Sequence, residues 1–468
     1  MNSKKKIVVL GGGISGLTAG YLLMKEGFDV TVLEKKAQPG GSIETVFENG
    51  FLFDKGPNSS LETYPIIKKI VDEINLSDEL VYASPEGSKR YILKKNKLIP
   101  LPMSPVSFFK TGLFSAKAKF RLLAEPFIKR AKEEESISGF VKRRIGKEFL
   151  DYAISPFVSG VYAGDPSSLS VKYAFPKLYE LEKKHRSLIL GTVKTIRQRK
   201  KRAEKSKQSA KMFSFKNGMG VLPNKIALSL GNNFLTSSEI KNIIKDGSAY
   251  KITYNRNNNE VELFADAIIS TVPSYVLSNL ISNLNEETAN KLNEIFYPSV
   301  LVLYLGYKKE SIKRELDGFG FLIPQKEKKS FLGAIWNSTL FPNRTNNDDV
   351  CFTLFIGGAL NKELSLKTKE QFIAKSIEEF SEIMNIYDEP FFVSSKFWEK
   401  AIPQYNLDYS MQLKAIVNFE KDNPGFFIGG NFRRGIALGD CFNSAEIISN
   451  EVKDYLNKHK NERDLTFV

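Results

Sequence analysis

The apolar positions near the start of the chain predict a strand, a helix and a second strand in close succession. Ile7–Leu10 is a short, uninterrupted apolar run, which is typical of a strand buried on both faces. A glycine-rich turn follows, and the spacing of apolar residues then predicts a helix over Ile14–Glu26 and a strand over Asp29–Leu33. This order predicts a parallel sheet covered by helices, and therefore an α/β fold.

Later apolar runs predict further elements, and the chain closes much as it opens. We expect strands within 50–60, 264–273, 296–307 and 351–357, helices within 115–155, and a strand, glycine loop and helix within 212–230. Residues 425–456 again predict a strand, a glycine loop and a long helix. Because such segments stand at both ends of the chain, we expect one discontinuous nucleotide-binding domain, with insertions forming the rest of the molecule.

The first turn carries glycines in the pattern of a dinucleotide site. Gly11, Gly13 and Gly16 follow the GxGxxG spacing. The first allows a tight turn, the second lets a pyrophosphate approach the backbone, and the third lets the helix pack closely. Glu34 ends the second strand, where its carboxylate can bind the hydroxyls of an adenosine ribose, which favours FAD or NAD over NADP. The alternative is a glycine-rich turn in an unrelated α/β domain.

The glycine loop near the end of the chain offers a second helix N-terminus. The helix is expected to begin around residues 438–443, with its N–H groups and dipole directed at a flavin ring or a phosphate. The alternative is an ordinary terminal strand and helix.

Composition places the chemistry on a cofactor rather than on side chains. The 468 residues are enough for two or three domains. With only two cysteines and two histidines, a disulfide framework and a zinc pattern are excluded, and a histidine-based triad nearly so. We therefore expect no metal site and a cofactor that carries the reaction. No apolar run is long enough to span a bilayer and the start is no signal peptide, so we expect a cytoplasmic protein or one on the inner face of the cell membrane.

The net charge of +15 is concentrated in part between Lys183 and Lys211. We expect this low-complexity stretch to be a solvated, mobile loop. Attraction to an anionic membrane surface is an alternative. Nucleic-acid binding is disfavoured, because no aromatic platform or reading motif accompanies the charge.

Several motifs resemble those of known flavoenzymes. The segments "VVLGGGISGLTAGYLL" and "GFLFDKGPNSS" resemble the flavin-containing amine oxidase superfamily. More specifically, "SPFVSGVYAGDPSSLSVKYAFPKLYELEKKHRSLILG", "SFKNGMGVLP" and "GGNFRRGIALGDC" resemble the oxygen-dependent protoporphyrinogen oxidase family, which includes coproporphyrinogen III oxidases. This similarity extends from about Lys4 to about Tyr455.

The resemblance implies an FAD enzyme late in haem synthesis. Such an enzyme oxidises a porphyrinogen to the porphyrin in three flavin reductions, and O2 reoxidises the flavin to give H2O2. The resemblance further implies a discontinuous Rossmann-like FAD domain, a mixed-sheet substrate domain and a helical, membrane-facing domain. We assign residues 1–75, 212–273 and 418–468 to the first, 76–97 and 274–417 to the second, and 98–211 to the third. A homodimer and hand-off of the product to the next haem-pathway enzyme are left open.

The family's cofactor motifs map onto this chain position by position. They imply FAD contacts from Gly11, Gly13, Ile14, Ser15, Gly16, Glu34, Gly40, Gly41, Ser42, Gly56, Pro57, Ile240, Gly430, Ile436 and Leu438. One departure is Ser42, because superfamily members often have Arg or Lys directly after the glycine pair.

The substrate motifs imply that Asn58 lies near the reacting face and that Arg90 pairs with a propionate, and these two are the expected catalytic residues. Pocket walls are expected from Phe319, Gly320, Leu322 and Phe355. The alternatives are a turn cap for Asn58, a surface strand residue for Arg90 and plain core for Leu322 and Phe355. Protoporphyrinogen IX is favoured over coproporphyrinogen III, because most of the basic surplus lies outside the pocket motifs.

Overall fold

The computed structural model describes residues 4–202 and 210–465, and the side chains of residues 4–195 and 210–458. Its centre is a parallel five-stranded sheet in the order β10-β2-β1-β14-β20. The strands are β1 (Lys6–Leu10), β2 (Asp29–Leu33), β10 (Phe234–Leu235), β14 (Ala267–Ser270) and β20 (Phe426–Ile428). Distant parts of the chain thus build one sheet, and the discontinuous Rossmann-like fold expected from the sequence is confirmed.

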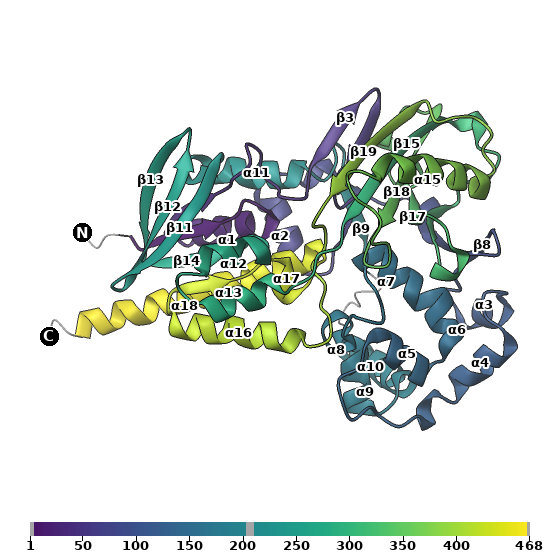
Figure 1. The fold of residues 1–468 in the computed structure, drawn as a ribbon, viewed down its shortest axis with the longest axis horizontal. Coiled ribbons are helices and arrows are strands. Elements are labelled where there is room, and N and C mark those ends of the chain that lie inside the picture. The colour runs from purple at the N-terminus through teal and green to yellow at the C-terminus, as the bar shows by residue number, and fades with distance from the viewer. Residues whose placement is uncertain (1–3, 203–209, 466–468) are drawn as a thin grey trace.

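Both faces of this sheet are covered, which explains why its strands are almost wholly apolar. One face packs on α1 (Ile14–Lys25), α2 (Pro65–Glu73), α11 (Val221–Leu230) and α18 (Leu438–Leu465). The other face packs on the strands β11 (Ser238–Asp246), β12 (Ala249–Arg256) and β13 (Asn259–Ala265), and on the helices α12 (Ser274–Ile281), α13 (Glu286–Asn293) and α16 (Tyr409–Asp422). Figure 1 shows the parallel sheet and the elements that cover it on the left, and both ends of the chain lie on that side.

A second, mixed sheet of seven strands forms the upper right of Figure 1, in the order β19-β15-β18-β17-β16-β7-β8. Its strands are β7 (Lys89–Lys94), β8 (Lys97–Pro100), β15 (Val300–Lys308), β16 (Gly318–Leu322), β17 (Phe331–Trp336), β18 (Asp349–Gly357) and β19 (Phe392–Trp398). Only the β16–β7 pair is parallel. The helix α15 (Lys369–Met384) packs on one face through Phe380 and Met384. The opposite face packs in part on Phe51 and Phe53, and at Ile92 it packs on Phe114 and Phe149.

Further short elements lie outside the two sheets. They are the hairpin β3 (Thr45–Glu48) and β4 (Phe51–Asp54), the small sheet of β5 (Ser60–Leu61), β6 (Leu80–Tyr82) and β9 (Met212–Phe215), and the helices α14 (Asn337–Leu340) and α17 (Asn431–Arg434).

A helical region lies at the lower right of Figure 1. It contains α3 (Pro105–Lys110), α4 (Ala116–Leu123), α5 (Ile137–Arg144), α6 (Lys147–Phe149), α7 (Ser155–Tyr162), α8 (Val171–Ala174), α9 (Pro176–His185) and α10 (Leu188–Arg202). Arg144 is fully buried at its centre, where it forms ion pairs with Glu125 and Glu182. A paired and hydrogen-bonded arginine of this kind ties helices together at a geometry that apolar packing alone would leave looser.

The expectation of a loop between Lys183 and Lys211 was wrong for the first part of this stretch, because α10 occupies residues 188–202. The cause lies partly outside the stretch. The Glu125 carboxylate accepts hydrogen bonds from the N–H groups of Leu188 and Ile189, and the Ser187 hydroxyl caps Leu190. These contacts satisfy the N–H groups of the first helical turn, which have no partner within the helix. Residues 203–209 lie outside the described residues, as do the side chains of 196–202.

Candidate functional site

The first glycine loop leaves an open space above its backbone. Gly11 has a φ of +101°, and a Cβ atom on Gly16 would overlap the carbonyl oxygen of Gly11. A Cβ on Gly13, in contrast, would meet no atom within 4 Å. The Gly40 N–H donates to the carbonyl of Gly12 at 2.8 Å and so joins the second glycine pair to the first loop. Close packing below and free space above are what a bound pyrophosphate needs.

The carboxylate of Glu34 is held in place at the end of β2. It is buried, and it accepts hydrogen bonds from the N–H groups of Gly12 at 2.7 Å and Lys36 at 2.8 Å. Each oxygen keeps a further lone pair for a ribose hydroxyl. The N–H of Ser238 donates to the Glu34 carbonyl, so the start of β11, with half-buried Ile240, lies beside the same strand end.

The second glycine pair meets the loop that follows β4. A Cβ on Gly56 would overlap the carbonyl oxygen of Ser42, so the two loops are in direct backbone contact. Ser42 itself is exposed. The Lys36 ammonium donates to the Gly41 carbonyl at 2.9 Å and brings a cation to this loop from another position. Sequence reasoning missed Lys36, although a lysine two residues after the ribose acid is a signal that could have been weighed.

Two helix N-termini meet beside the first loop. Gly430 has a φ of +92°, and half-buried Ile436 leads into Leu438, the first residue of α18. The thiol of Cys441, in the first turn of α18, bonds with the hydroxyl of Ser15 in the first turn of α1. Burial raises the pKa of this thiol to about 11, so it stays protonated and serves as a contact rather than a nucleophile.

The face of the seven-stranded sheet opposite α15 is built from two rows of residues across four strands. In the first row, strand pairing aligns Thr353, Ile335, Gly320 and Arg90. The second row aligns Phe355, Gly333, Leu322 and Ile92. Each row contains one glycine, and a Cβ on Gly320 would overlap the carbonyl of Ala334.

Residues aligned across strands point to the same side of a sheet, so these rows form one wall. Gly333, like Gly320, lies too close to the backbone of the neighbouring strand to carry a Cβ atom. Ile335, Leu322 and Phe355 are all half-buried there, whereas their sequence neighbours on the α15 side are buried. The expected residues Gly320, Leu322 and Phe355 are thus brought together. Sequence reasoning missed Ile335 and Thr353, which the alternation of β17 and β18 could have indicated.

Arg90 stands at the end of the first row with a free charge. Its guanidinium carbon lies 5.5 Å from the centre of the Phe319 ring, a cation–π arrangement. The lysines nearby are neutralised, since Lys89 pairs with Asp317, Lys94 with Glu148 and Lys326 with Asp151. Within residues 4–195 and 210–458, Arg90 has no carboxylate partner, and its side chain is exposed.

Asn58 lies between the two sheets. It is buried, and its Oδ1 accepts a hydrogen bond from Asn337 Nδ2 at 2.9 Å. Its own Nδ2 lies 3.4 Å from the carbonyl of Gly56, a long bond within the loop. Its polar contacts thus reach beyond its own turn to the end of β17.

Asp54, which ends β4, anchors this loop and was not predicted. Its buried carboxylate pairs with Arg344 at 3.3 Å, accepts the N–H of Met219 at 2.9 Å and bonds with the Thr45 hydroxyl. Burial raises the pKa of Asp54, and the guanidinium of Arg344 opposes that rise. The hydroxyl of Tyr304 on β15 donates to the Asp54 carbonyl at 2.8 Å. In the sequence, the signal that could have indicated Asp54 is a single acidic residue at the end of an apolar strand.

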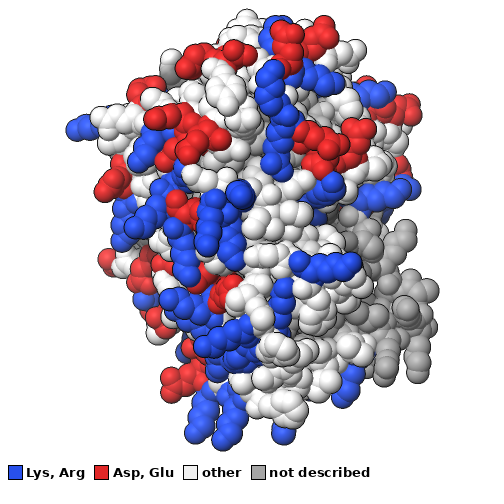
Figure 2. All heavy atoms as spheres, turned by 90° about the vertical axis from the view of Figure 1, so that its right-hand side faces the viewer, with Lys and Arg blue, Asp and Glu red and all other residues white. Residues whose placement is uncertain are grey.

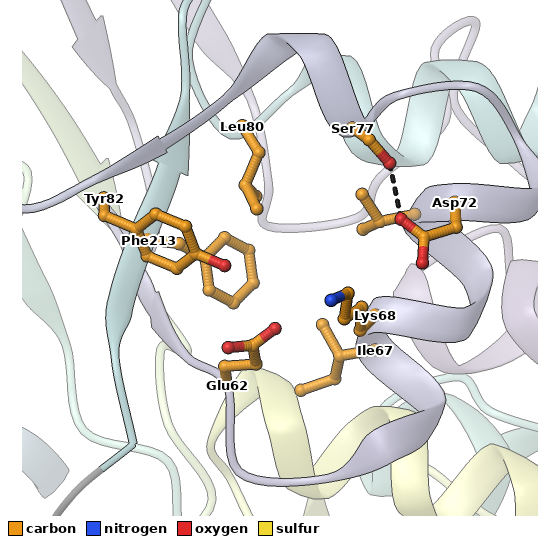
Figure 3. A pocket seen from close by; sticks show the side chains of 9 residues that line it. Glu62, Ile67, Lys68, Asp72, Ser77, Leu80, Tyr82 and Phe213 are labelled. Carbon is orange, nitrogen blue, oxygen red and sulfur yellow. Dashed lines mark hydrogen bonds between the residues drawn. The ribbon is translucent and has the colours of Figure 1, made fainter.

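A separate cavity of about 250 Å³ lies between α2 and the small sheet of β5, β6 and β9 (Figure 3). Apolar side chains of Ile67, Leu80 and Phe213 line it, with Glu62 and Lys68 also pointing inward. None of its lining residues belongs to the expected cofactor or substrate set, so it is not part of the candidate site. Within the described side chains, no cluster of three or more His, Cys, Asp or Glu could hold a metal ion.

The parallel sheet with glycine loops and facing helix N-termini defines a dinucleotide-binding protein. Residues 14–453 match the flavin containing amine oxidoreductases, and the chain belongs to that family. The cofactor is therefore FAD, as the sequence predicted, and the open space over Gly13 and the fixed carboxylate of Glu34 fit its pyrophosphate and ribose. Bound FAD supplies a two-electron acceptor for hydride removal.

The relatives of known name span the whole chain. Protoporphyrinogen oxidase 2 of Arabidopsis thaliana is 33% identical, with 98% of this chain and 96% of that protein covered. Coproporphyrinogen III oxidase of Bacillus subtilis is 27% identical, with 97% and 99% covered. Among solved structures, cyclohexylamine oxidase of Brevibacterium oxydans has a TM-score of 0.69 at 13% identity, with 97% and 100% covered, which shows the shared fold.

Proposed function

We propose that this oxidoreductase converts protoporphyrinogen IX to protoporphyrin IX, with O2 as the electron acceptor and H2O2 as the product. The observation that carries the proposal is full-length similarity to proteins named protoporphyrinogen oxidase, at 31–35% identity over at least 97% of the chain. With FAD bound, each two-electron step would remove one hydride and one proton from the macrocycle, and one O2 would accept both electrons and two protons to give H2O2.

The wall of the second sheet supports a flat apolar substrate with acid groups at one edge. Leu322, Ile335 and Phe355 offer an apolar surface. Such a surface can hold a macrocycle close to the flavin and exclude water, which hydride removal requires. We assign Asn58 to the reacting face of this pocket.

The charges at the end of the wall support protoporphyrinogen IX. This substrate carries two propionates, whereas coproporphyrinogen III carries four. Among the described residues no carboxylate pairs with Arg90, while Lys89, Lys94 and Lys326 are paired. A guanidinium can bind a carboxylate through two parallel hydrogen bonds. We therefore assign Arg90 as the propionate anchor.

Coproporphyrinogen III is the second candidate substrate. The relatives from Bacillus subtilis and Staphylococcus aureus carry the name coproporphyrinogen III oxidase, at 27% and 25% identity over nearly the whole chain. The same wall and cofactor would serve this reaction, and the acid groups would then require further cations.

Steady-state rates on both porphyrinogens test the proposal. FAD-loaded protein is mixed with each substrate under air, and porphyrin fluorescence and H2O2 are followed together. We expect a higher kcat/KM for protoporphyrinogen IX, with H2O2 formed in step with porphyrin. A higher value for coproporphyrinogen III would transfer the assignment to the second candidate. Flavin that neither porphyrinogen reduces under anaerobic conditions would overturn both.

We also propose that the helical region binds the surface of an anionic membrane on its cytoplasmic side. Apolar side chains are exposed along α3, α4 and the turn after α4, namely Met103, Val106, Phe109, Phe120, Leu123 and Phe127. Basic residues with exposed side chains alternate with them, namely Lys110, Lys117, Lys129 and Arg130. Figure 2 views this side of the molecule and shows uncharged surface next to Lys and Arg side chains. Together they favour peripheral binding through apolar contact and charge.

No helix within residues 4–202 and 210–465 has the length and apolar character needed to cross a bilayer. The homodimer and the hand-off to a next enzyme stay predictions of the resemblance.

A further inference from the structure

The loop between β20 and α18 carries two of the expected flavin contacts. It begins at Gly430 and ends at Ile436, with the short helix α17 between them, and we call residues 430–436 the α17 loop. Gly430 and Gly435 have φ angles of +92° and +131°, so the backbone turns sharply before and after α17. A helix of four residues leaves most of its N–H and C=O groups without an intrahelical partner. The polar groups of this loop therefore need partners from elsewhere in the chain.

The hydroxyl of Tyr405 joins the two ends of the α17 loop. It donates to the carbonyl of Asn431 and accepts the N–H of Gly435 at 3.1 Å. Tyr405 is only 4% exposed, and burial raises the pKa of its hydroxyl, which therefore keeps the proton that it donates. One hydroxyl thus uses both of its hydrogen-bonding roles on residues four positions apart in the same loop.

Two side chains of α16 hold the α17 loop as well. The hydroxyl of Tyr409, the first residue of α16, donates to the carbonyl of Phe432. The carboxylate of Glu420, near the end of the same helix, pairs with Arg433 through Nη1 at 2.5 Å and Nη2 at 2.7 Å. A fork of two parallel bonds fixes an orientation as well as a distance. The loop is therefore held from one side, by α16 and by Tyr405 just before it.

We propose that Tyr405 is a positioning residue for FAD, whose hydroxyl sets the spacing between the two ends of the α17 loop and so places Gly430 and Ile436 against the flavin. The inference rests on the expected flavin contacts of these two residues. The ring of Tyr405 is buried in the apolar core, 4.9 Å from the ring of Tyr409 between centres. Since the two hydrogen bonds of the hydroxyl are both made to the α17 loop, its effect on the flavin passes through that loop.

Tyr405→Phe tests the proposal, because it removes the hydroxyl and keeps the ring. Tyr250→Phe is the matched control. Tyr250 is also buried, at 1% exposure, and its hydroxyl donates to the carbonyl of Pro424 at 3.0 Å, which lies before β20 rather than after it. Both variants and the wild type are prepared without FAD, and the unfolding temperature and the FAD affinity of each are measured. The visible absorption and the reduction potential of the bound flavin are then recorded.

We expect both variants without FAD to unfold at a lower temperature than the wild type, because each loses buried hydrogen bonding. Tyr405→Phe alone should bind FAD about tenfold more weakly, which is the scale of one hydrogen bond, because the loop must then be ordered when the cofactor binds. The absorption bands and the reduction potential of its flavin should also shift, since both depend on the groups packed against the ring. Tyr250→Phe should keep the wild-type affinity, absorption and potential.

A second variant tests the same loop if Tyr405→Phe fails to fold. Arg433→Lys keeps the positive charge but loses the two parallel bonds to Glu420, so it should weaken FAD binding in the same direction. Arg434→Lys is its control, because Arg434 pairs instead with Glu451 on α18, whose side chain is more exposed than that of Glu420. Arg434→Lys should therefore bind FAD as the wild type does.

The proposal is overturned if Tyr405→Phe loses stability but keeps the FAD affinity, the flavin absorption and the reduction potential of the wild type, because its hydroxyl would then serve the fold alone. It is also overturned if Tyr250→Phe loses as much FAD affinity as Tyr405→Phe. None of these measurements uses a porphyrinogen. A protein that shows the expected flavin changes but oxidises no porphyrinogen would contradict only the proposed function, so the two failures are distinguishable.

Discussion

The cofactor side and the substrate side of the site are built in different ways. The dinucleotide loop uses backbone atoms, and its main parts lie between β1 and the end of β2, within one short stretch of sequence. The wall that we propose for the substrate uses side chains from β7, β16, β17 and β18, together with a loop after β4. The first can be recognised from local spacing, whereas the second exists only after the sheet has formed.

This difference predicts which property of the protein a substitution on each side should change. A backbone-built site tolerates little change in residue size, because the atoms that would collide are main chain. A wall of side chains tolerates change one residue at a time, and its losses should appear in substrate binding rather than in cofactor content. The predictions below test that separation.

The largest effect is expected where the two sides join. Asp54→Ala would leave the buried guanidinium of Arg344 without its carboxylate and free the N–H of Met219. Breaking a buried ion pair in this way costs about 3–5 kcal/mol. We expect a large fall in the free energy of unfolding, measured by urea titration, with loss of both FAD and activity.

Glu262→Ala is the control for Asp54→Ala, because Glu262 is exposed and its ion pair with Lys251 is of the surface kind that is worth about 0–1 kcal/mol. Equal stability losses in the two variants would show that the junction is not a special feature of the fold.

The glycines of the first loop give the next largest effect. Gly16→Ala places a Cβ against the carbonyl of Gly11 and should destabilise the protein without FAD by about 3 kcal/mol. Gly13→Ala meets no atom within 4 Å, so the protein without FAD should unfold at the wild-type temperature. Its methyl group would instead occupy the space for the pyrophosphate and weaken FAD binding. Thermal melts with and without FAD distinguish the two variants. A Gly13→Ala protein that keeps full FAD affinity would contradict the placement of the pyrophosphate over Gly13.

Much of the cofactor side could be predicted from the sequence. The expected strand at 29–33 has the bounds of β2, and the expected helix from Ile14 ends one residue early, at Lys25. These elements were predictable because propensity, glycine spacing and apolar period all lie within about thirty residues. The helix α10 was missed although Ser187 offered a local cap, and the carboxylate that also binds its first turn comes from Glu125, far outside the stretch.

The substrate side was predictable only through family resemblance. That resemblance supplied Leu322 and Phe355, which the wall does bring together. It did not supply Asp54, Ile335 or Asn337, since their partners are set by strand register and by contacts across hundreds of residues. Local patterns carry no information about such pairs.

Arg90→Ala tests the substrate side alone. If Arg90 anchors a propionate, its loss should mainly raise KM, because the pairing is made equally in ground and transition states. A charge-assisted hydrogen bond of about 1.5–3 kcal/mol corresponds to roughly a ten- to hundredfold lower kcat/KM. Arg90→Lys should recover only part, because an ammonium cannot form two parallel bonds. FAD content should stay unchanged, and a loss of FAD from Arg90→Ala would break the separation between the two sides.

The smallest effect concerns the helical region, which belongs to neither side of the site. Phe127 is 87% exposed on the turn after α4, next to Lys129 and Arg130. If this surface meets lipid, Phe127→Ser should lower binding to anionic vesicles about fivefold, since partial transfer of one ring out of lipid costs about 1 kcal/mol. Phe47→Ser is the matched control, because Phe47 is also highly exposed but lies on the β3–β4 hairpin. Flotation with vesicles at low and high salt measures both variants. If the two variants bind vesicles equally, or if the wild-type protein never floats, the exposed side chains of α3 and α4 have another role. In either case the turnover of Phe127→Ser in detergent-free buffer should equal that of the wild type, because Phe127 lies outside both halves of the site.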